Sequence, residues 1–540
     1  MKKIITLLVV LSSLYTHFLQ AQTLDYCFVF VGCNRVDNAQ AGGADSSTAN
    51  VYHLNRTFSE VAQMNPLPKY FFFVGDLILG YTDGDSVILA NEYNAWKQLY
   101  LNSPLASTSV QLVVMPGNHE VENNSTSTQA LASAERTFVR EMQPFILGNN
   151  GPKATGLVPG TDSLITDQSQ LTYSFDYKNL SSKNDHFVVV NTDPVGRDFI
   201  APFHWVDSNL TAARNNPETR HIFVFGHKPA YPSGSSPTDG LTMYPTYRNN
   251  FWNALENNRA EAMFSAHNHT WDTIHYLSYP KTIAWQVIAG NGGSPPASSF
   301  NPAYYGYTVV NIYTNGQVTL QNMGRTISAA TYTASVPANP TTQRGTAINI
   351  TYPTTINFQP FFNSGGSGPF SSQVTITDND TVTSAYVVYT VNSGTSDTIR
   401  LTADSANVYK FTIPAQSDTT PGSISYKIVA NGSTVATYPS SSTQASFVFN
   451  SPLAVIPPLP TAEDIKAYPN PTTGILTIDL SKHKGISGIN IQNINGVSVK
   501  NIAITGSIIN TDISTLAPGA YFLIFTASNG QQYVKKIIKN

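Results

Sequence analysis

Short apolar runs that end in polar clusters recur through the first 330 residues. Each run is nearly continuous in apolar side chains and rich in aromatic and β-branched residues, a pattern typical of strands buried on both faces of a sheet. The runs span residues 26–31, 70–74, 112–115, 186–190, 221–225 and 262–264. Polar residues just past the carboxyl ends of strands carry the chemistry of open α/β sheets, so we expect a functional site along one sheet edge.

Amphipathic helical patterns lie between these runs. Residues 49–64, 87–101 and 128–142 place apolar side chains at mixed spacings of three and four, as helices that pack one face on a sheet require. Strand-like runs return at 283–289 and 307–313. The alternation of strands and helices predicts one α/β domain over residues 22–330.

The pattern changes near residue 330. Beyond it the apolar segments are short, rich in Thr, Val and Tyr, separated by turn residues and free of helical periodicity. The clearest segments are 348–358, 373–376, 384–389, 409–413 and 423–429. They predict an all-β sandwich over residues 331–452 that resembles immunoglobulin-like and fibronectin-like modules. Residues 453–464 are proline-rich and indicate a semi-rigid linker, and residues 465–540 form a second small all-β sandwich module.

The N-terminal segment has the organisation of a signal peptide. Lys2 and Lys3 precede a nearly continuous apolar run at 4–14, and Ala21 ends a plausible cleavage site. We therefore expect residues 1–21 to be removed on export. The run is shorter than the ~20 apolar residues of a membrane span, and no later uncharged stretch reaches that length, so we expect no transmembrane span.

Composition narrows the class of protein. Of the 540 residues, 41% are hydrophobic and 12% are charged, which supplies sizeable cores and excludes a disordered chain. The formal net charge is −3 and there is no basic stripe, so we expect no nucleic-acid partner. The two cysteines, Cys27 and Cys33, share one extended run and would lie ~20 Å apart, beyond disulfide reach. We expect Cys27 to be a small core residue.

Four polar clusters at the ends of predicted strands offer metal ligands. They are Gly75-Asp76, Gly117-Asn118-His119-Glu120, Gly226-His227 and His267-Asn268-His269. A parallel sheet would bring them to one edge, where a carboxylate, an amide oxygen and imidazoles form the mixed set that binds two divalent ions about 3.5–4 Å apart. Such a pair binds phosphate oxygens and creates a hydroxide nucleophile near neutral pH, and a nearby imidazole can protonate the leaving group.

Each cluster alone has a simpler interpretation. Gly-Asp after a strand is usually a turn, and a lone histidine such as His227 is usually a packed residue. The rings of His267 and His269 would face opposite ways if their strand continued. Gly-Asn-His-Glu is the most specific cluster, because neither its glycine nor its amide suits a buried strand. The ordered set favours metal chemistry over packing.

Together the clusters resemble the calcineurin-like metallophosphoesterase superfamily, which includes the purple acid phosphatases. The family pattern is an early aspartate motif, then GD, GNH[DE], a lone histidine and GHxH, and four of these five motifs occur in order within residues 24–325. Segments 289–293 and 305–309 resemble the Gly-rich turn and closing strand of the same family. The resemblance implies a four-layer α/β/β/α sandwich.

The resemblance also implies roles for individual residues. The implied ligands are Asp76 as the bridge, Asn118, His227 and His267 for one metal, and His269 for the other. His119 becomes the residue that stabilises the transition state or protonates the leaving group. The implied cofactors are two divalent metal ions, of zinc, iron or manganese.

The first motif departs from the family pattern. Aligned on Gly32, Cys33 replaces the usual aspartate and Arg35 the usual histidine. A Cys33 thiolate is a good ligand for zinc or iron, and the fork of Arg35 suits two phosphate oxygens. Two alternatives stay open: Asn34 or Asp37 reaches the metal from a shifted loop, or Cys33 is inert and the second metal site is weak or empty.

The tyrosine ligand of purple acid phosphatases is also missing. The family places it three residues after the aspartate of the GD motif, where Leu79 stands in this chain. Tyr81 is close in sequence but out of register. We therefore do not expect an Fe(III)–tyrosinate enzyme.

Residues 465–540 resemble the C-terminal sorting domain of type IX secretion. The matching pieces are Tyr468-Pro469-Asn470-Pro471, Gly474, Asn493, Gly496, Leu516, Gly519, Tyr521 and residues 534–538. The resemblance implies export by the outer-membrane secretion machinery of a Gram-negative bacterium, removal of the tail, and then release or anchoring at the cell surface. A plain structural β-domain is the alternative.

These expectations converge on a secreted metal-dependent phosphoesterase, acid phosphatase-like, that hydrolyses phosphate monoesters or diesters. One alternative is a degenerate phosphoesterase fold that acts as a cell-surface binding module. Another is an adhesin whose β-domains carry the function. The first motif separates the enzyme from the degenerate fold, because the other four motifs are intact.

Overall fold

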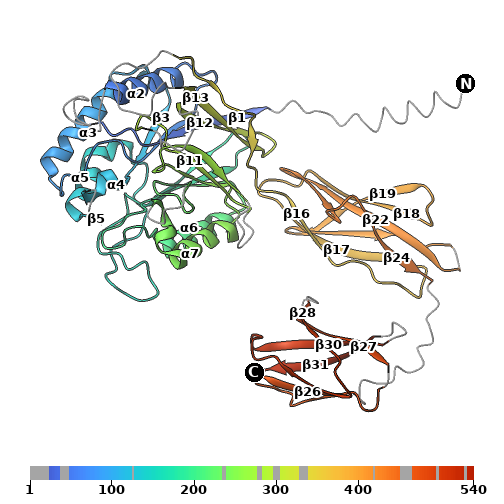
Figure 1. The fold of residues 1–540 in the computed structure, drawn as a ribbon. Helices are drawn as coiled ribbons and strands as arrows, with labels where there is room; N and C mark the ends of the chain where they lie inside the picture. The colour runs from blue at the N-terminus through green and yellow to red at the C-terminus, as the bar shows by residue number, and fades with distance from the viewer. Residues whose placement is uncertain are drawn as a thin grey trace, which may run out of the picture. The chain divides into compact units, whose positions relative to one another are not determined.

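Figure 1 shows the fold of the chain in a computed structural model. The structure describes residues 23–36, 48–124, 127–233, 239–275, 283–295, 304–326, 339–417, 420–450, 465–483, 485–493, 498–527 and 532–540. The expected signal peptide and linker, and Asp37, lie outside the described residues. The chain divides into two compact units, which are described separately. The first reaches to Phe361 and adds Pro369–Pro414 and Ser425–Ser446; the second comprises Phe362–Gly368, Ala415–Ile424 and Phe447–Asn540.

The first sheet of the α/β region contains the strands of the first three apolar runs. Its order is β14-β13-β12-β1-β2-β3, with β15 beside β13. The strands are β1 (Leu24–Val31), β2 (Tyr70–Val74), β3 (Gln111–Met115), β12 (Tyr304–Tyr313), β13 (Val318–Thr326), β14 (Thr342–Gln343) and β15 (Ile348–Asn349). Because β1, β2 and β3 pair in parallel, their carboxyl ends lie at one end of the sheet.

The second sheet contains the other three runs. Its order is β10-β11-β9-β8-β7-β6. The strands are β6 (Tyr173–Lys178), β7 (Asn184–Val190), β8 (Thr219–Gly226), β9 (Ala262–Ser265), β10 (Trp271–Ile274) and β11 (Trp285–Ala289). The strands β7, β8, β9 and β11 pair in parallel, so their carboxyl ends also lie together.

The two sheets pack face to face, and β2 shows how. Successive side chains of a strand point to opposite faces. Phe72 stacks on Phe225 of the second sheet, with ring centroids 4.0 Å apart. Phe71 and Phe73 instead contact the helix side, where the ring of Phe73 lies 5.3 Å from that of Trp96. Both faces of β2 are therefore buried, as its continuous apolar run predicts.

Helices cover the outer face of each sheet (Figure 1). The helices α2 (Thr48–Val61), α3 (Ser86–Leu101) and α5 (Ala132–Met142) share the core of the first sheet. The helices α6 (Phe203–Asn215) and α7 (Pro245–Asn257) share a second core with the outer face of the second sheet. The predicted four-layer α/β/β/α sandwich is confirmed.

Shorter elements fill the connections. They are α4 (Asn118–Val121), the pair β4 (Glu122–Asn124) and β5 (Ser127–Ala130), and 3₁₀ turns at Pro104–Ser107, Gln143–Phe145 and Leu241–Met243. The helix expected over 128–142 begins only at Ala132, because the preceding residues pair as a strand with β4. The helix α4 begins directly at the end of β3, which places Asn118 and His119 at its first turn.

Two further sheets form the predicted β-sandwich. One contains β16 (Thr355–Phe358), β17 (Phe370–Thr377), β20 (Thr402–Ser405) and β21 (Val408–Ile413). The other contains β18 (Ser384–Val391), β19 (Ser396–Arg400), β22 (Gly422–Asn431), β23 (Val435–Tyr438) and β24 (Ala445–Phe449). In β22 every second residue is buried, so one face of the strand packs on a core.

The C-terminal module is the second predicted all-β sandwich. One sheet contains β25 (Lys466–Tyr468), β26 (Ile475–Asp479) and β29 (Ile508–Asp512), and the other β27 (Ile486–Asn493), β28 (Ser498–Ile502), β30 (Gly519–Ala527) and β31 (Gln532–Lys539). Its core is mostly aliphatic, with Ile478, Ile491 and Leu523 fully buried beside Phe525. In the described part of the chain, no helix has the length and apolar character needed to cross a membrane.

Candidate metal centre

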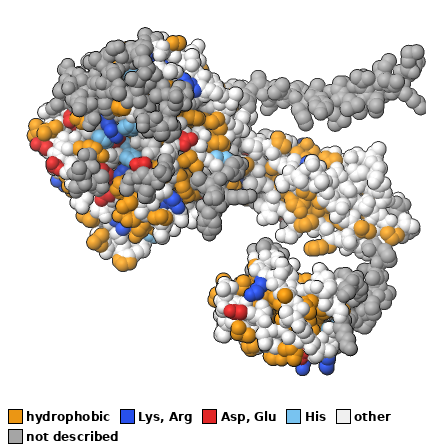
Figure 2. Space-filling model, in the orientation of Figure 1, with side chains coloured by type: hydrophobic (Ala, Val, Ile, Leu, Met, Phe, Trp, Pro, Cys, Tyr) orange, Lys and Arg blue, Asp and Glu red, His pale blue; other side chains and the backbone are white. Residues whose placement is uncertain are grey.

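The carboxyl ends of the two sheets meet, and their polar clusters meet with them. The backbone N–H of Cys33, after β1, donates to Gly75 after β2 at 3.0 Å. The backbone N–H of Ala266, after β9, donates to His227 after β8 at 3.0 Å. The N–H of His267 donates across the sheets to Cys33 Sγ at 3.2 Å. Figure 2 shows histidine side chains gathered with cationic and acidic ones on one face of the α/β region.

The backbone around the cluster is held in conformations that side chains rarely adopt. Cys33, Asp76 and His267 have φ values of 61°, 55° and 63°, in the left-handed region. Such conformations cost about 1–3 kcal/mol each and concentrate at functional sites. Gly117 has no room for a side chain, because a Cβ there would lie 2.5 Å from Asp76 Oδ1. The tight GD and GN turns therefore press the backbone directly against the carboxylate.

One group of donor atoms contains Asp76, Asn118, His227 and His267. Asn118 Oδ1 lies 3.0 Å from His227 Nε2 and 2.9 Å from His267 Nδ1. His227 Nε2 also lies 3.0 Å from Asp76 Oδ1 and 3.3 Å from His267 Nδ1. His227 Nδ1 donates to the carbonyl of Val74 at 2.7 Å, so in the neutral ring Nε2 carries the lone pair. Four atoms with lone pairs thus converge on one point, an arrangement that a cation stabilises.

The electrostatics of this group match a cation site. Burial acts to lower the pKa of His227, but Asp76 outweighs it, and the net shift is upward. Burial acts to raise the pKa of Asp76, but His227, His119 and Arg35 outweigh it and hold the carboxyl well below its usual range. Burial, with His227 next, lowers the pKa of His267. Asp76 is therefore a permanent anion among imidazole nitrogens.

A second group contains Cys33, Asp76 and His269. One ligand atom from each lies within 4.8 Å of the other two. His269 Nδ1 donates to the carbonyl of Pro295 at 2.9 Å, and its buried Nε2 has no hydrogen-bond partner among the described residues. Burial, with Asp76 next, raises the pKa of the Cys33 thiol. A thiolate, a carboxylate and an imidazole suit zinc or ferrous iron, so the donor set fits a divalent ion.

His119 lies beside the two groups without joining either. Its Nε2 is 3.9 Å from Asp76 Oδ2, while its Nδ1 donates to the carbonyl of Leu79 at 2.5 Å. Burial lowers the pKa of His119 to about 3. The carbonyl fixes the ring so that Nε2 faces the centre, where it can act on a bound group.

Arg35 lies closer to the centre than its sequence interpretation suggests. Its Nε and Nη2 donate to Asp76 Oδ2 at 3.3 and 3.2 Å. Its side chain is 19% exposed, whereas that of Asp76 is fully buried. The guanidinium therefore stands between the shared carboxylate and solvent.

The structure brings all the sequence-predicted site residues around Asp76. They are Cys33, Arg35, Asp76, Asn118, His119, His227, His267 and His269. Of the alternative ligands, Asn34 is buried and donates its amide to the carbonyl of Gly292 at 3.1 Å.

Sequence reasoning gave no role to Glu120, which joins two of the motifs. Its buried carboxylate accepts the backbone N–H groups of Gly117 at 2.6 Å, Asp76 at 2.8 Å and Ile78 at 3.1 Å. The GD and GNHE turns are thereby fixed to each other. The sequence signal that could have identified Glu120 is its charge, because the other residues of the GNHE motif lie in a tight, buried turn.

A buried charge network lies behind His227. Lys228 Nζ donates to Glu122 at 2.7 Å and Asp193 at 2.6 Å, and all three side chains are about 1% exposed. The network ties the ends of β7 and β8 to the segment after α4. Sequence reasoning missed it because the three residues are separated by up to 106 positions.

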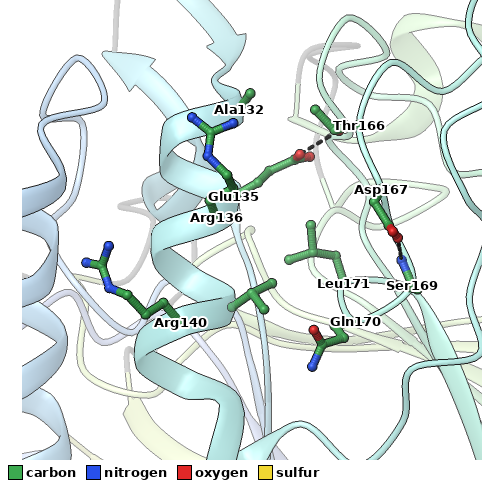
Figure 3. Close-up of a pocket in the computed structure, with 10 residues that line it drawn as sticks. Ala132, Glu135, Arg136, Arg140, Thr166, Asp167, Ser169, Gln170 and Leu171 are labelled. Atoms are coloured by element: carbon green, nitrogen blue, oxygen red, sulfur yellow. Dashed lines mark hydrogen bonds between the residues drawn. The ribbon is translucent and has the colours of Figure 1, made fainter.

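A cavity lies away from these donor atoms (Figure 3). It measures about 510 Å³ and lies between α5 and the segment 166–171, with Arg136 and Arg140 on the helix side. None of its lining residues belongs to the metal centre. The candidate chemistry therefore rests on the convergent donor atoms and not on cavity size.

Two parts of the chain match known protein families. Residues 44–271 match the family model of the calcineurin-like phosphoesterases, and residues 466–540 match that of the secretion system C-terminal sorting domain. No curated protein matches the chain. Purple acid phosphatase PPD1 from yellow lupin (Lupinus luteus) is 15% identical, with a TM-score of 0.40 over 56% of this chain and 52% of that one. PhoD is 15% identical, with a TM-score of 0.38 over 60% and 69%. The chain thus spans about half the length of the lupin protein.

Proposed function

Because residues 44–271 form a calcineurin-like phosphoesterase domain, we propose that this chain is a metal-dependent phosphoesterase that hydrolyses phosphate esters at a dinuclear site. One observation carries the proposal. The donor atoms of Asn118, His227 and His267 lie within 2.9–3.3 Å of one another beside Asp76. Packing alone gives no reason to bury these lone pairs together.

Two metal positions share Asp76 in this proposal. Asn118, His227 and His267 would hold one ion, Cys33 and His269 would hold the other, and the Asp76 carboxylate would be available to both. Two observations within the described residues support the second position: Nε2 of His269 has no hydrogen-bond partner, and Sγ of Cys33 accepts a backbone N–H. The soft thiolate favours zinc or iron over manganese at that position.

The chemistry that divalent ions supply in such a site is polarisation of a phosphoryl oxygen and activation of a water nucleophile. The chain supplies the remaining functions. His119, fixed through Nδ1 by the Leu79 carbonyl, presents Nε2 to a departing oxygen. Burial lowers its pKa to about 3, so we propose that it donates a proton there only when the negative charge of bound phosphate stabilises its imidazolium form. Arg35 lies at the mouth of the site with its fork on Asp76 Oδ2, and we propose that the fork turns to phosphoryl oxygens when substrate binds.

The sorting domain makes this a secreted or cell-surface protein. We propose the outer-membrane secretion machinery as its partner during export. Acid phosphatase-like activity on organic phosphate esters is the substrate class that we propose for the exported enzyme.

The test is hydrolysis of one aryl phosphate monoester and one diester by the chain from residue 22. The protein is stripped of metal and then given Zn²⁺, Fe²⁺ or Mn²⁺. We expect turnover only after metal is returned, with the preferred ester assigning the subclass. His119→Ala should lower kcat by about 10²–10⁴-fold while metal still binds, since it removes the proton donor and no ligand.

Asn118→Ala is the matched ligand variant, and it should lose metal and activity together. Absence of turnover with every metal on both esters would contradict the proposal and favour the degenerate binding module.

A further inference from the structure

Tyr81 lies beside the metal centre although its sequence position is out of register for a ligand. It follows the GD turn and has a φ of 55°, in the left-handed region. Its ring centroid is 4.1 Å from that of His119, with the planes tilted by 43°. Its hydroxyl oxygen accepts a hydrogen bond from Asn118 Nδ2. Tyr81 therefore touches both side chains of the GNHE motif that face the centre.

The orientation of Asn118 matters for metal binding. An asparagine amide has oxygen at one end and an NH₂ group at the other, and only the oxygen can be a ligand. In the structure Oδ1 faces His227 Nε2 and His267 Nδ1 at 3.0 and 2.9 Å. Rotation by half a turn would instead point two N–H donors at the ion and leave the site without this ligand.

Tyr81 is held where it can prevent that rotation. Its backbone N–H donates to the carbonyl of His119 at 3.3 Å, and the preceding Gly80 N–H donates to the buried Glu92 carboxylate at 2.8 Å. The hydroxyl thus meets the amide from a fixed backbone. In the structure the hydroxyl accepts from Nδ2, so the NH₂ group faces Tyr81 and the oxygen faces the imidazoles.

We infer that Tyr81 is a positioning residue that orients the Asn118 amide and thereby sets metal affinity. The inference rests on the proposed function, because it concerns the same site. It differs from a tyrosine ligand: the position three residues after Asp76 holds Leu79, whose carbonyl accepts from His119. Tyr81 acts through Asn118 and not on the ion.

The first experiment measures the dissociation constant of Zn²⁺ or Mn²⁺ in Tyr81→Phe by competition with a chromogenic chelator. This variant keeps the ring against His119 and removes only the hydroxyl. We expect binding to weaken by about 10–100-fold, as for other residues that orient metal ligands. Tyr93→Phe is the control, because its buried hydroxyl has no partner in the described residues, and its metal affinity should equal that of the wild type.

The decisive experiment repeats Tyr81→Phe in the Asn118→Asp background. A carboxylate has oxygen at both ends, so its rotation no longer matters to the ion. We expect the hydroxyl deletion to lose its effect on affinity there, which a double-mutant cycle reports as coupling between the two residues. An equal loss of affinity in both backgrounds would overturn the inference.

Four other outcomes are decisive. A visible tyrosinate–Fe(III) absorption band that vanishes in Tyr81→Phe would make Tyr81 a ligand and overturn the inference. A change in KM alone, with metal affinity unchanged, would make it a substrate contact and overturn it as well. A wild-type protein that binds no divalent ion would overturn the proposed function too, whereas an active wild type with an unaffected Tyr81→Phe would overturn only this inference.

Discussion

The two halves of the metal centre differ in how closely their ligands approach. Around Asn118, donor atoms from three motifs lie 2.9–3.3 Å apart and beside Asp76. Around Cys33, the three ligand atoms lie within 4.8 Å of one another, and burial raises the pKa of the Cys33 thiol. In the proposed dinuclear site, we expect the Asn118 half to hold an ion more tightly, because the Cys33 thiol would have to release a proton before it binds one.

The largest effect should come from breaking the Asn118 half. His227→Ala removes a ligand and leaves Asp76 without its nearest imidazole, so we expect kcat to fall by more than about 100-fold at saturating metal. Cys33→Ala should cost about tenfold, because the second ion keeps Asp76 and His269. Steady-state hydrolysis of an aryl phosphate gives the kcat of each variant, and the two losses can then be compared. A Cys33→Ala loss equal to that of His227→Ala would remove the distinction between the halves.

The metal preference should shift when the unusual ligand is replaced. Cys33→Asp exchanges a soft thiolate for a hard carboxylate, so we expect activity with Mn²⁺ to rise relative to activity with Zn²⁺ by about 10–100-fold. Reactivation of metal-free protein with each ion gives the two activities. Cys27→Ser is the matched control, since Cys27 lies within the core and away from the ligands. An unchanged preference would mean that Cys33 does not bind metal.

The two halves should also differ in their response to pH. Burial raises the pKa of the Cys33 thiol, so each ion bound there displaces a proton at neutral pH. Affinity at the weaker site should therefore rise by about tenfold per pH unit as pH increases from about 6 to 8. His269, whose pKa burial lowers to about 3, adds nothing in this range. In Cys33→Asp the pH dependence of metal affinity should disappear. Titration calorimetry at three pH values tests this. If affinity still rises with pH in the variant, the displaced proton belongs to another group.

The smallest effect should come from the C-terminal module. Its described core shares no residue with the metal centre. Ending the chain at residue 464 should therefore leave kcat and KM unchanged while export fails. Activity of the purified truncated protein and its location in cells are the two measurements. A loss of kcat would show that the module contributes to the site.

The strand ends of the site were predictable from sequence, because topology alone brings them together. Asp76 and His227 each follow a continuous apolar run, and parallel pairing then fixes which end of the sheet they share. Their identity as oxygen and nitrogen donors was readable in the motifs. Neither step required knowledge of a side-chain contact.

Contacts that depend on the paths of loops were not predictable. Arg35 was expected to bind phosphate, and nothing in its spacing showed that its fork would reach Asp76. Tyr81 was not expected to be a ligand, because it is out of register with the tyrosine ligand of purple acid phosphatases. Its left-handed backbone nevertheless turns its hydroxyl to Asn118. Similarly, the start of the helical pattern predicted over 128–142 belongs instead to β5, which pairs with β4, because strand pairing outweighed local propensity.

Asp76 and His227 belong to different sheets, and their contact has a mechanical consequence. An ion bound to both side chains would link the two sheets of the sandwich. Any ligand that binds only the folded state stabilises it, by about 2.7 kcal/mol at one hundred times its dissociation constant. The melting temperature of this domain should therefore serve as a gauge of metal loading that can be read without any substrate.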